Sequence, residues 1–163
     1  MSVPTVVIAE DEPLVRRELR EMLAHLWPDL TVLAEAADGF EALTALERFH
    51  PDILFLDIHM PGLNGLEVAG RLHAGAHVVF VTAFDRYAVA AFEQGAVDYV
   101  LKPISPTRLR LTVERLRTKL CEPPADLSEI ALLLKDIASA GSRYLKWLTV
   151  PDHSELKVLA VSQ

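Results

Sequence analysis

The segment Ile53-Leu54-Phe55-Leu56-Asp57 is an unbroken apolar run that ends on a carboxylate. Continuous apolar runs are typical of strands that are buried on both faces of a parallel sheet, whereas half-exposed strands alternate apolar and polar residues. The run therefore predicts a central strand at 53–56, with Asp57 at its carboxyl end. Similar short runs predict further strands at 5–9, 31–35, 78–82 and 98–101.

Helical patterns alternate with these strands along the chain. The first begins near Pro13, because proline lacks only an N–H that the first turn of a helix leaves unpaired, and it repeats apolar residues at helical spacing as far as Leu26. Further helices are predicted at about 40–49, after Gly65, at about 86–94 before Gly95, and from Ser105-Pro106 onward. Five successive strand–helix units predict an α/β fold with a doubly wound five-stranded parallel sheet.

The segment Glu122-Pro123-Pro124-Ala125 interrupts this regular pattern and predicts a domain boundary. We expect one domain at 1–121, a linker at 122–143 and a further segment at 144–163. The linker contains an amphipathic helix whose apolar stripe consists of Leu127, Ile130, Leu134 and Ile137. The last segment has the pattern of a C-terminal β-hairpin.

The composition fits a globular protein with a sizeable core. The chain has 163 residues, of which 51% are hydrophobic, and its net charge of −7 disfavours a surface that grips nucleic acid. No apolar stretch approaches the roughly 18 residues of a membrane span, and no secretory signal is visible, so we expect a soluble cytoplasmic protein without membrane contact. The single cysteine, Cys121, cannot form an internal disulfide and suits a reducing compartment.

Polar residues stand at the expected carboxyl ends of the strands, which is where doubly wound sheets bind their ligands. They come from four strands: Glu10 and Asp11 after the first, Asp57 at the third, Thr82 at the fourth and Lys102 after the fifth. Any one acid at a strand end could simply cap the next helix. Together, the set predicts one crevice that contains three carboxylates, a hydroxyl group and an ammonium group.

These groups favour phosphoryl chemistry. Clustered carboxylates repel one another, so such a cluster usually holds a hard cation, and oxygen ligands suit Mg²⁺ or Mn²⁺. Asp57 could then attack a phosphoryl group and form an aspartyl phosphate. The metal ion and Lys102 would neutralise the phosphoryl oxygens, while Thr82 would donate a hydrogen bond to them.

The motifs resemble the receiver domain of response regulators over about residues 4–120: Glu10-Asp11, Leu56-Asp57-Ile58-His59-Met60-Pro61-Gly62, Thr82-Ala83 and Lys102-Pro103. The resemblance implies a flavodoxin-like (βα)5 fold in which a sensor histidine kinase phosphorylates Asp57 with the help of Mg²⁺. It implies a signalling protein with only limited self-phosphorylation and self-dephosphorylation, not an enzyme. The first carboxylate of the acidic pair is Glu where Asp is commoner.

The resemblance also implies roles for individual residues. The ligands of Mg²⁺ would be the side chains of Glu10, Asp11 and Asp57 and the backbone carbonyl of His59. Lys102 and Thr82 would contact the phosphoryl group, and the Lys102-Pro103 bond would be cis. Thr82 and Tyr99 would form the pair of side chains that switches on phosphorylation.

Two further stretches are similar to the LytR/AlgR family of transcription regulators. Residues 84–103 resemble the receivers of that family, and Tyr144-Leu145-Lys146-Trp147-Leu148-Thr149-Val150 resembles the opening strand of its LytTR DNA-binding domain. The chain stops well before that domain would be complete. We therefore expect 144–163 to be its start, and DNA binding to occur only through the full-length LytTR domain.

A homodimer on phosphorylation is expected, because regulators that read repeated half-sites usually bind as symmetric pairs. One candidate surface is a basic helix whose cations could pair with acids of a second copy: Arg108, Arg110, Arg115, Arg117 and Lys119 with Asp85, Glu93 and Asp98. The other surface is the linker helix. The plainer alternatives are a solvated face for the basic helix and a linker helix that folds back on its own domain.

Two other functions would use the same features. An aspartyl phosphohydrolase would share the nucleophile, but such enzymes place it on the first strand, where this chain has Glu10-Asp11. An interaction module that is never phosphorylated would have no use for Asp57, Thr82 and Lys102 together. Phosphoacceptor signalling therefore remains the expected function.

Overall fold

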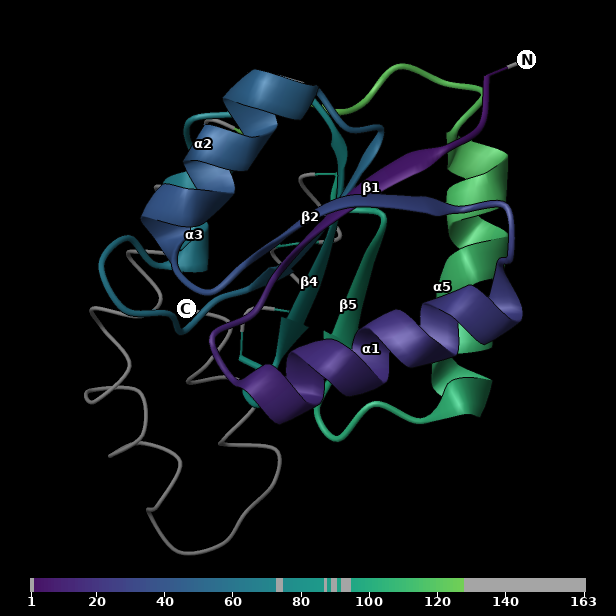
Figure 1. Ribbon diagram of the computed structural model, residues 1–163, viewed down its shortest axis with the longest axis horizontal. Coiled ribbons are helices and arrows are strands. Elements are labelled where there is room, and N and C mark those ends of the chain that lie inside the picture. Colours follow the sequence, from purple (N-terminus) through teal and green to yellow (C-terminus); the bar gives the residue numbers. More distant parts are fainter. Residues whose placement is uncertain (1, 73–74, 87, 89–90, 92–94, 128–163) are drawn as a thin grey trace, which may run out of the picture.

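The computed structural model describes residues 2–127 apart from 73–74, 87, 89–90 and 92–94 (Figure 1). Its strands are β1 (Thr5–Ala9), β2 (Thr31–Ala36), β3 (Ile53–Asp57), β4 (His77–Thr82) and β5 (Asp98–Leu101). Its helices are α1 (Pro13–Leu26), α2 (Gly39–Phe49), α3 (Gly65–Ala69) and α5 (Pro106–Lys119). The helix expected at about 86–94 falls largely outside the described residues, and so do the linker helix beyond Leu127 and the C-terminal hairpin.

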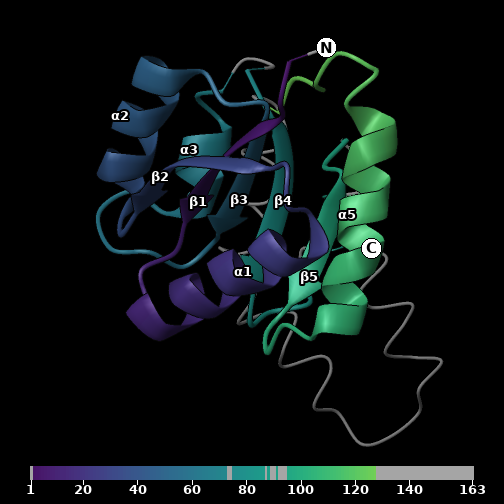
Figure 2. The ribbon, with the colours of Figure 1, turned by 45° about the vertical axis from the view of Figure 1, so that its right-hand side comes forward.

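The five strands form one parallel sheet in the order β2-β1-β3-β4-β5. The helices α1 and α5 cover one face of it, and α2 and α3 cover the other (Figures 1 and 2). Each face has its own apolar core, because successive strand residues point to opposite sides: Phe55 faces the first pair of helices, whereas Leu54 and Phe80 face the second pair. The predicted doubly wound fold is confirmed.

The apolar runs predicted the strands to within one residue at each end. β3 is one residue longer than expected, so Asp57 is itself the last residue of the strand, and β4 begins one residue earlier at the buried His77. α1 begins at Pro13, and α5 begins after Ser105, whose side chain accepts a hydrogen bond from the N–H of Arg108. None of the helices in the described ranges is long and apolar enough to cross a bilayer.

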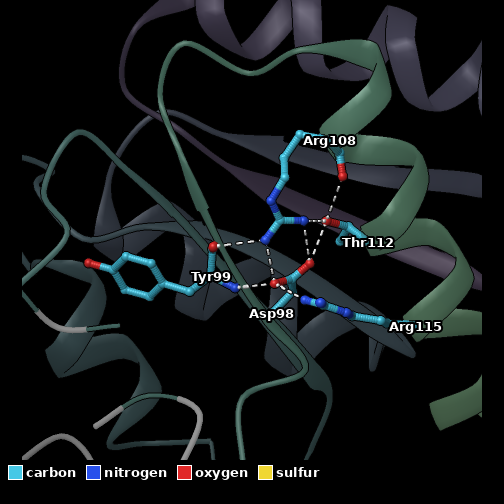
Figure 3. Close-up of polar contacts among 5 residues, drawn as sticks. All are labelled: Asp98, Tyr99, Arg108, Thr112 and Arg115. Carbon is cyan, nitrogen blue, oxygen red and sulfur yellow. Dashed lines mark hydrogen bonds and ion pairs between the residues drawn. The ribbon is translucent and has the colours of Figure 1, made fainter. Parts of the chain in front are cut away.

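A buried carboxylate joins α5 to the start of β5 (Figure 3). Asp98 has no exposed surface, and two nitrogens of the Arg108 guanidinium donate to its oxygens at 2.7 and 2.8 Å. The hydroxyl of Thr112 and a guanidinium nitrogen of Arg115 each donate to Asp98 at 2.7 Å. The same cluster holds the backbone of Tyr99, whose N–H donates to Asp98 and whose carbonyl accepts from Arg108.

This cluster corrects the expected role of the basic helix. We expected Arg108 and Arg115 to pair with acids such as Asp98 of a second copy, but in the structure both pair with Asp98 of the same chain. The physical reason is the position of Asp98, which opens a strand directly beneath α5. A carboxylate that is buried there requires charged partners from the helix that covers it.

The cluster predicts how stability depends on Asp98 and on acid. Burial acts to raise the pKa of Asp98, but the hydrogen bonds from Arg108 and Thr112 outweigh it and hold the pKa below its ordinary value. The stabilisation is therefore complete above about pH 4 and is lost as the pH falls through the lower pKa of the folded state. We expect Asp98→Asn to lower the free energy of unfolding at pH 7 by about 2 kcal/mol, since the two arginines lose their charged partner.

Urea unfolding at pH 7 and along an acid series measures both effects. The matched control is Asp29→Asn, which changes an exposed carboxylate and should alter stability by less than about 0.5 kcal/mol. Equal stability of Asp98→Asn and the control would contradict the stabilising role of the cluster.

Candidate functional site at the carboxyl edge of the sheet

The ammonium group of Lys102 lies among three carboxylates at the carboxyl edge of the sheet. Its Nζ is 2.8 Å from Oε2 of Glu10, 3.2 Å from Oδ2 of Asp57 and 3.1 Å from Oε1 of Glu12. Glu10 follows β1, Asp57 ends β3 and Lys102 follows β5. Three of the residues that the sequence assigned to one crevice are thus in direct contact, although they come from distant parts of the chain.

Backbone geometry at the ends of β4 and β5 directs Lys102 into this pocket. The N–H of Lys102 donates to the carbonyl of Thr82 at 2.8 Å, so the two strand ends remain joined. The Lys102-Pro103 peptide bond is cis, as the family resemblance implied. The Lys102 side chain is only 13% exposed, and its charge therefore acts inside the pocket.

Burial shifts the pKa of each group in the pocket. Glu10 is 2% exposed, and burial together with the charge of Asp57 raises its pKa to about 7 although Lys102 opposes the rise. Burial likewise raises the pKa of Asp57. For Lys102, burial acts to lower the pKa, but the hydrogen bond to Glu10 and the charge of Asp57 outweigh it and raise the pKa. The pocket therefore contains more negative charge than one ammonium group balances.

The donor set fits a divalent cation. Glu10, Asp11 and Glu12 bring carboxylate oxygens within 4.8 Å of one another. Oε2 of Glu10 is buried and lies 2.8 Å from the Lys102 ammonium. A carboxylate oxygen has a further lone pair for a hard cation, and carboxylates are the ligands that Mg²⁺ prefers. The residues present are therefore suitable for Mg²⁺.

The other predicted residues surround Asp57. The backbone N–H of His59 donates to Oδ1 of Asp57 at 3.3 Å. Thr82 is fully buried, and its Oγ1 accepts a hydrogen bond from the N–H of Phe84 at 3.4 Å. Tyr99 is 5% exposed, and its hydroxyl donates to the carbonyl of Phe84. Both members of the expected switch pair therefore contact the backbone of Phe84.

Sequence reasoning missed two features of the pocket. Glu12 contacts Lys102, and the signal was present in the sequence as the third acid of Glu10-Asp11-Glu12. Phe84 lies on the rim, where its ring centroid is 4.5 Å from that of His59 and 5.2 Å from the guanidinium carbon of Arg86. The position of Phe84 two residues after Thr82 was the only hint of this contact.

Two glycines shape the loop that follows Asp57. Gly62 has a φ of +74°, a left-handed conformation that side chains disfavour. Gly65 donates its N–H to the carbonyl of Ile58 at 2.7 Å, and a Cβ on Gly65 would lie 2.2 Å from the carbonyl oxygen of Asp57. The start of α3 can approach the end of β3 this closely only without a side chain at 65.

We expect Gly65→Ala to lower the free energy of unfolding by roughly 2 kcal/mol or more, because a rigid methyl group would displace the backbone of Asp57. Gly70→Ala is the matched control, since Gly70 ends the same helix in a right-handed conformation that alanine adopts freely. Chemical denaturation of the two variants measures the difference. Equal stabilities would mean that the close contact at Gly65 relaxes without cost.

The chain matches the family model of the response regulator receiver domain over residues 6–114. An uncharacterized response regulatory protein of Vibrio cholerae serotype O1 is 42% identical to it over 98% of this chain and 64% of the relative. The transcriptional regulatory protein BtsR of Escherichia coli strain K12 is 38% identical over 94% of this chain and 61% of its own length. The chain thus spans less than two thirds of the length of these relatives.

Solved receiver structures have the same fold. The REC domain of AraT, a response regulator from Geobacillus stearothermophilus, has a TM-score of 0.66 at 36% identity and covers 73% of this chain and 96% of its own. The response regulatory domain of mrkE from Klebsiella pneumoniae has a TM-score of 0.66 at 34% identity. The match covers 71% of this chain and 97% of the mrkE domain. The chain therefore belongs to the response regulator receiver family, and it contains the receiver domain of a two-component response regulator.

Proposed function

We propose that this chain is the phosphoacceptor part of a transcription regulator and that it takes a phosphoryl group from a sensor histidine kinase onto Asp57. The observation that carries the proposal is the contact of Lys102 with Asp57 and Glu10 in one buried pocket. A nucleophilic carboxylate, a fixed cation and spare acidic ligands are the groups that phosphoryl transfer requires.

The residues of the pocket have separate tasks in this reaction. An oxygen of Asp57 attacks the phosphorus atom of the donor phosphohistidine, an O–P bond forms, and the N–P bond breaks with its electron pair returning to the imidazole. Burial makes the Asp57 carboxylate more basic and hence a better nucleophile. Lys102 stays charged and neutralises a phosphoryl oxygen, and the hydroxyl of Thr82 donates to another.

A divalent cation would complete the site. Mg²⁺ held by the side chains of Glu10, Asp11 and Asp57 and the backbone carbonyl of His59 would supply a second positive charge for the phosphoryl oxygens. The carboxylate oxygens of Glu10 and Asp11, which lie within 4.8 Å of each other, support this assignment. Glu12, which is exposed, serves instead to orient Lys102.

We expect Asp57→Asn to abolish Mg²⁺-dependent phosphorylation by acetyl phosphate, because the amide keeps the shape of the side chain but is not a nucleophile. Intact-mass spectrometry detects the added phosphoryl group. Asp52→Asn is the matched control, since Asp52 precedes the opposite end of β3 and should leave labelling unchanged. Undiminished labelling of Asp57→Asn, or full labelling in excess chelator, would overturn the assignment.

Phosphorylation would alter the contacts of Phe84. An aspartyl phosphate adds roughly −1.5 to −2 charge and new acceptor oxygens, which would draw the Thr82 hydroxyl away from the Phe84 N–H. Tyr99, which donates to the carbonyl of the same residue, would then move as well. The changed surface would favour a homodimer. The transcriptional regulatory protein BtsR, a relative of this chain, supports a role in transcription. The resemblance of residues 144–150 to the opening strand of a LytTR domain supports DNA contact through that domain in the full-length protein.

Tyr99→Phe is expected to leave phosphorylation intact but to weaken phosphorylation-dependent dimerisation roughly 3- to 10-fold, the effect of one lost hydrogen bond. Light scattering with and without beryllofluoride measures the dimerisation constant. Intact mass after separate treatment with acetyl phosphate and Mg²⁺ verifies that Asp57 of the variant still accepts the phosphoryl group. A variant that dimerises as tightly as the natural chain would exclude Tyr99 from the coupling.

A further inference from the structure

Residues 121–127, which we name the strap, leave the end of α5 and return across the receiver. In Figure 1 the light-green segment runs over the end of the sheet at which β4 begins, opposite the edge that carries Asp57. The N–H of Glu122 donates to the carbonyl of Lys119 at 2.9 Å, and the segment reaches Leu127, whose side chain is 2% exposed. The strap is therefore packed against the receiver.

Two contacts hold the middle of the strap. A ring nitrogen of His77, the first residue of β4, lies 3.1 Å from the carbonyl oxygen of Glu122, which is a hydrogen-bond distance. Ala125 lies against Gly95, where an added Cβ would be 2.6 Å from the Ala125 Cβ. Gly95 also has a φ of +112°, so glycine is required there both by the backbone and by the close approach of the strap.

Leu127 connects the strap with the proposed switch. It is buried in the same apolar cluster as Tyr99. The hydroxyl of Tyr99 donates to the carbonyl of Phe84, and the N–H of Phe84 donates to Thr82 at the phosphorylation pocket. Hydrogen bonds thus connect Thr82 to Tyr99, and Tyr99 belongs to the apolar cluster in which Leu127 is buried.

Close packing means that the buried position of Leu127 fits only one arrangement of the surrounding core side chains. Protein interiors are as dense as crystals of small molecules, so a cavity that fits Leu127 when Tyr99 is in one position loses contacts when Tyr99 moves. In the described arrangement Lys102 pairs with a free Asp57 carboxylate. We propose that the strap is docked in the unphosphorylated receiver and released when Asp57 is phosphorylated, an inference that rests on the proposed function.

Release of the strap would change where the following chain can reach. While Leu127 is docked, the chain beyond it starts from a fixed point on the receiver surface. The seven residues of the freed strap would span roughly 20 Å when extended. That length would let the following segment meet a second copy of the chain, which gives phosphorylation a route to assembly that does not use the arginines bound to Asp98.

The reactivity of a thiol at position 127 tests the proposal. In Leu127→Cys combined with Cys121→Ser, the buried thiol should react with Ellman's reagent about 100-fold more slowly than the exposed Cys121 of the natural chain. Addition of beryllofluoride and Mg²⁺ should speed its reaction at least about tenfold, while natural Cys121 reacts equally fast in both states. Equal rates at 127 with and without beryllofluoride, or a basal rate as fast as that of Cys121, would overturn the proposal.

A second variant tests the same coupling through a readout other than thiol reactivity. By linkage, a substitution that weakens docking must favour the released state, so Leu127→Ala should bind beryllofluoride about three- to tenfold more tightly than the natural chain. Unchanged or weaker binding would contradict the coupling. Intact mass after acetyl phosphate treatment distinguishes failure of the proposed function from failure of this inference alone. If Asp57 is not labelled, the proposed function is wrong and this inference is wrong with it. If Asp57 is labelled but Leu127 stays buried, only this inference is rejected.

Discussion

The Lys102 ammonium lies between two buried carboxylates, and the electrostatics of the pocket depend on this contact. Glu10 and Asp57 would each be costly to ionise in the interior, and burial raises the pKa of both. One lysine offsets only part of that cost, so the pocket has a remaining attraction for positive charge. A second cation relieves this imbalance, and the oxygens of a phosphoryl group can then approach two positive centres. In the proposed function, this imbalance would prepare the pocket for phosphoryl transfer.

The sheet and its connections keep these groups within hydrogen-bond distance of one another. Parallel strands place Glu10, Asp57 and Lys102 at a common edge, and the short strand β5 delivers Lys102. β5 is fixed at its other end by Asp98, whose partners on α5 also hold the backbone of Tyr99. Loss of the cluster around Asp98 would therefore disturb the position of Lys102 through β5, although no charge of that cluster contacts Asp57.

The parts that sequence predicts well are those with a local pattern. Apolar runs predicted all five strands. The crevice followed from the rule that the carboxyl ends of parallel strands lie at one edge, and this rule correctly placed Lys102 beside Asp57, which is 45 residues away in the sequence. Arg108 and Arg115 were misjudged because cations on a helix have the same pattern whether they face water or a buried acid. Glu12 was missed as a contact for a similar reason, because the rim of the pocket has no periodic signal. Leu127 belongs to the predicted apolar stripe, and its burial in the receiver core agrees with the alternative that this segment folds back on its own domain.

The structure also restricts which parts can respond to phosphorylation. The central strands are buried on both faces, and α5 is fastened to β5 through Asp98, so neither can shift without breaking charged hydrogen bonds or close packing. Phe84 is different, because it is 39% exposed and is held to Thr82 and Tyr99 mainly by its backbone. The strap contacts the rest of the receiver through residues that include Glu122, Ala125 and Leu127. In the proposed function, a signal that begins at Asp57 would follow the least constrained elements, and these lead from Phe84 through Tyr99 to the strap rather than to the basic face of α5.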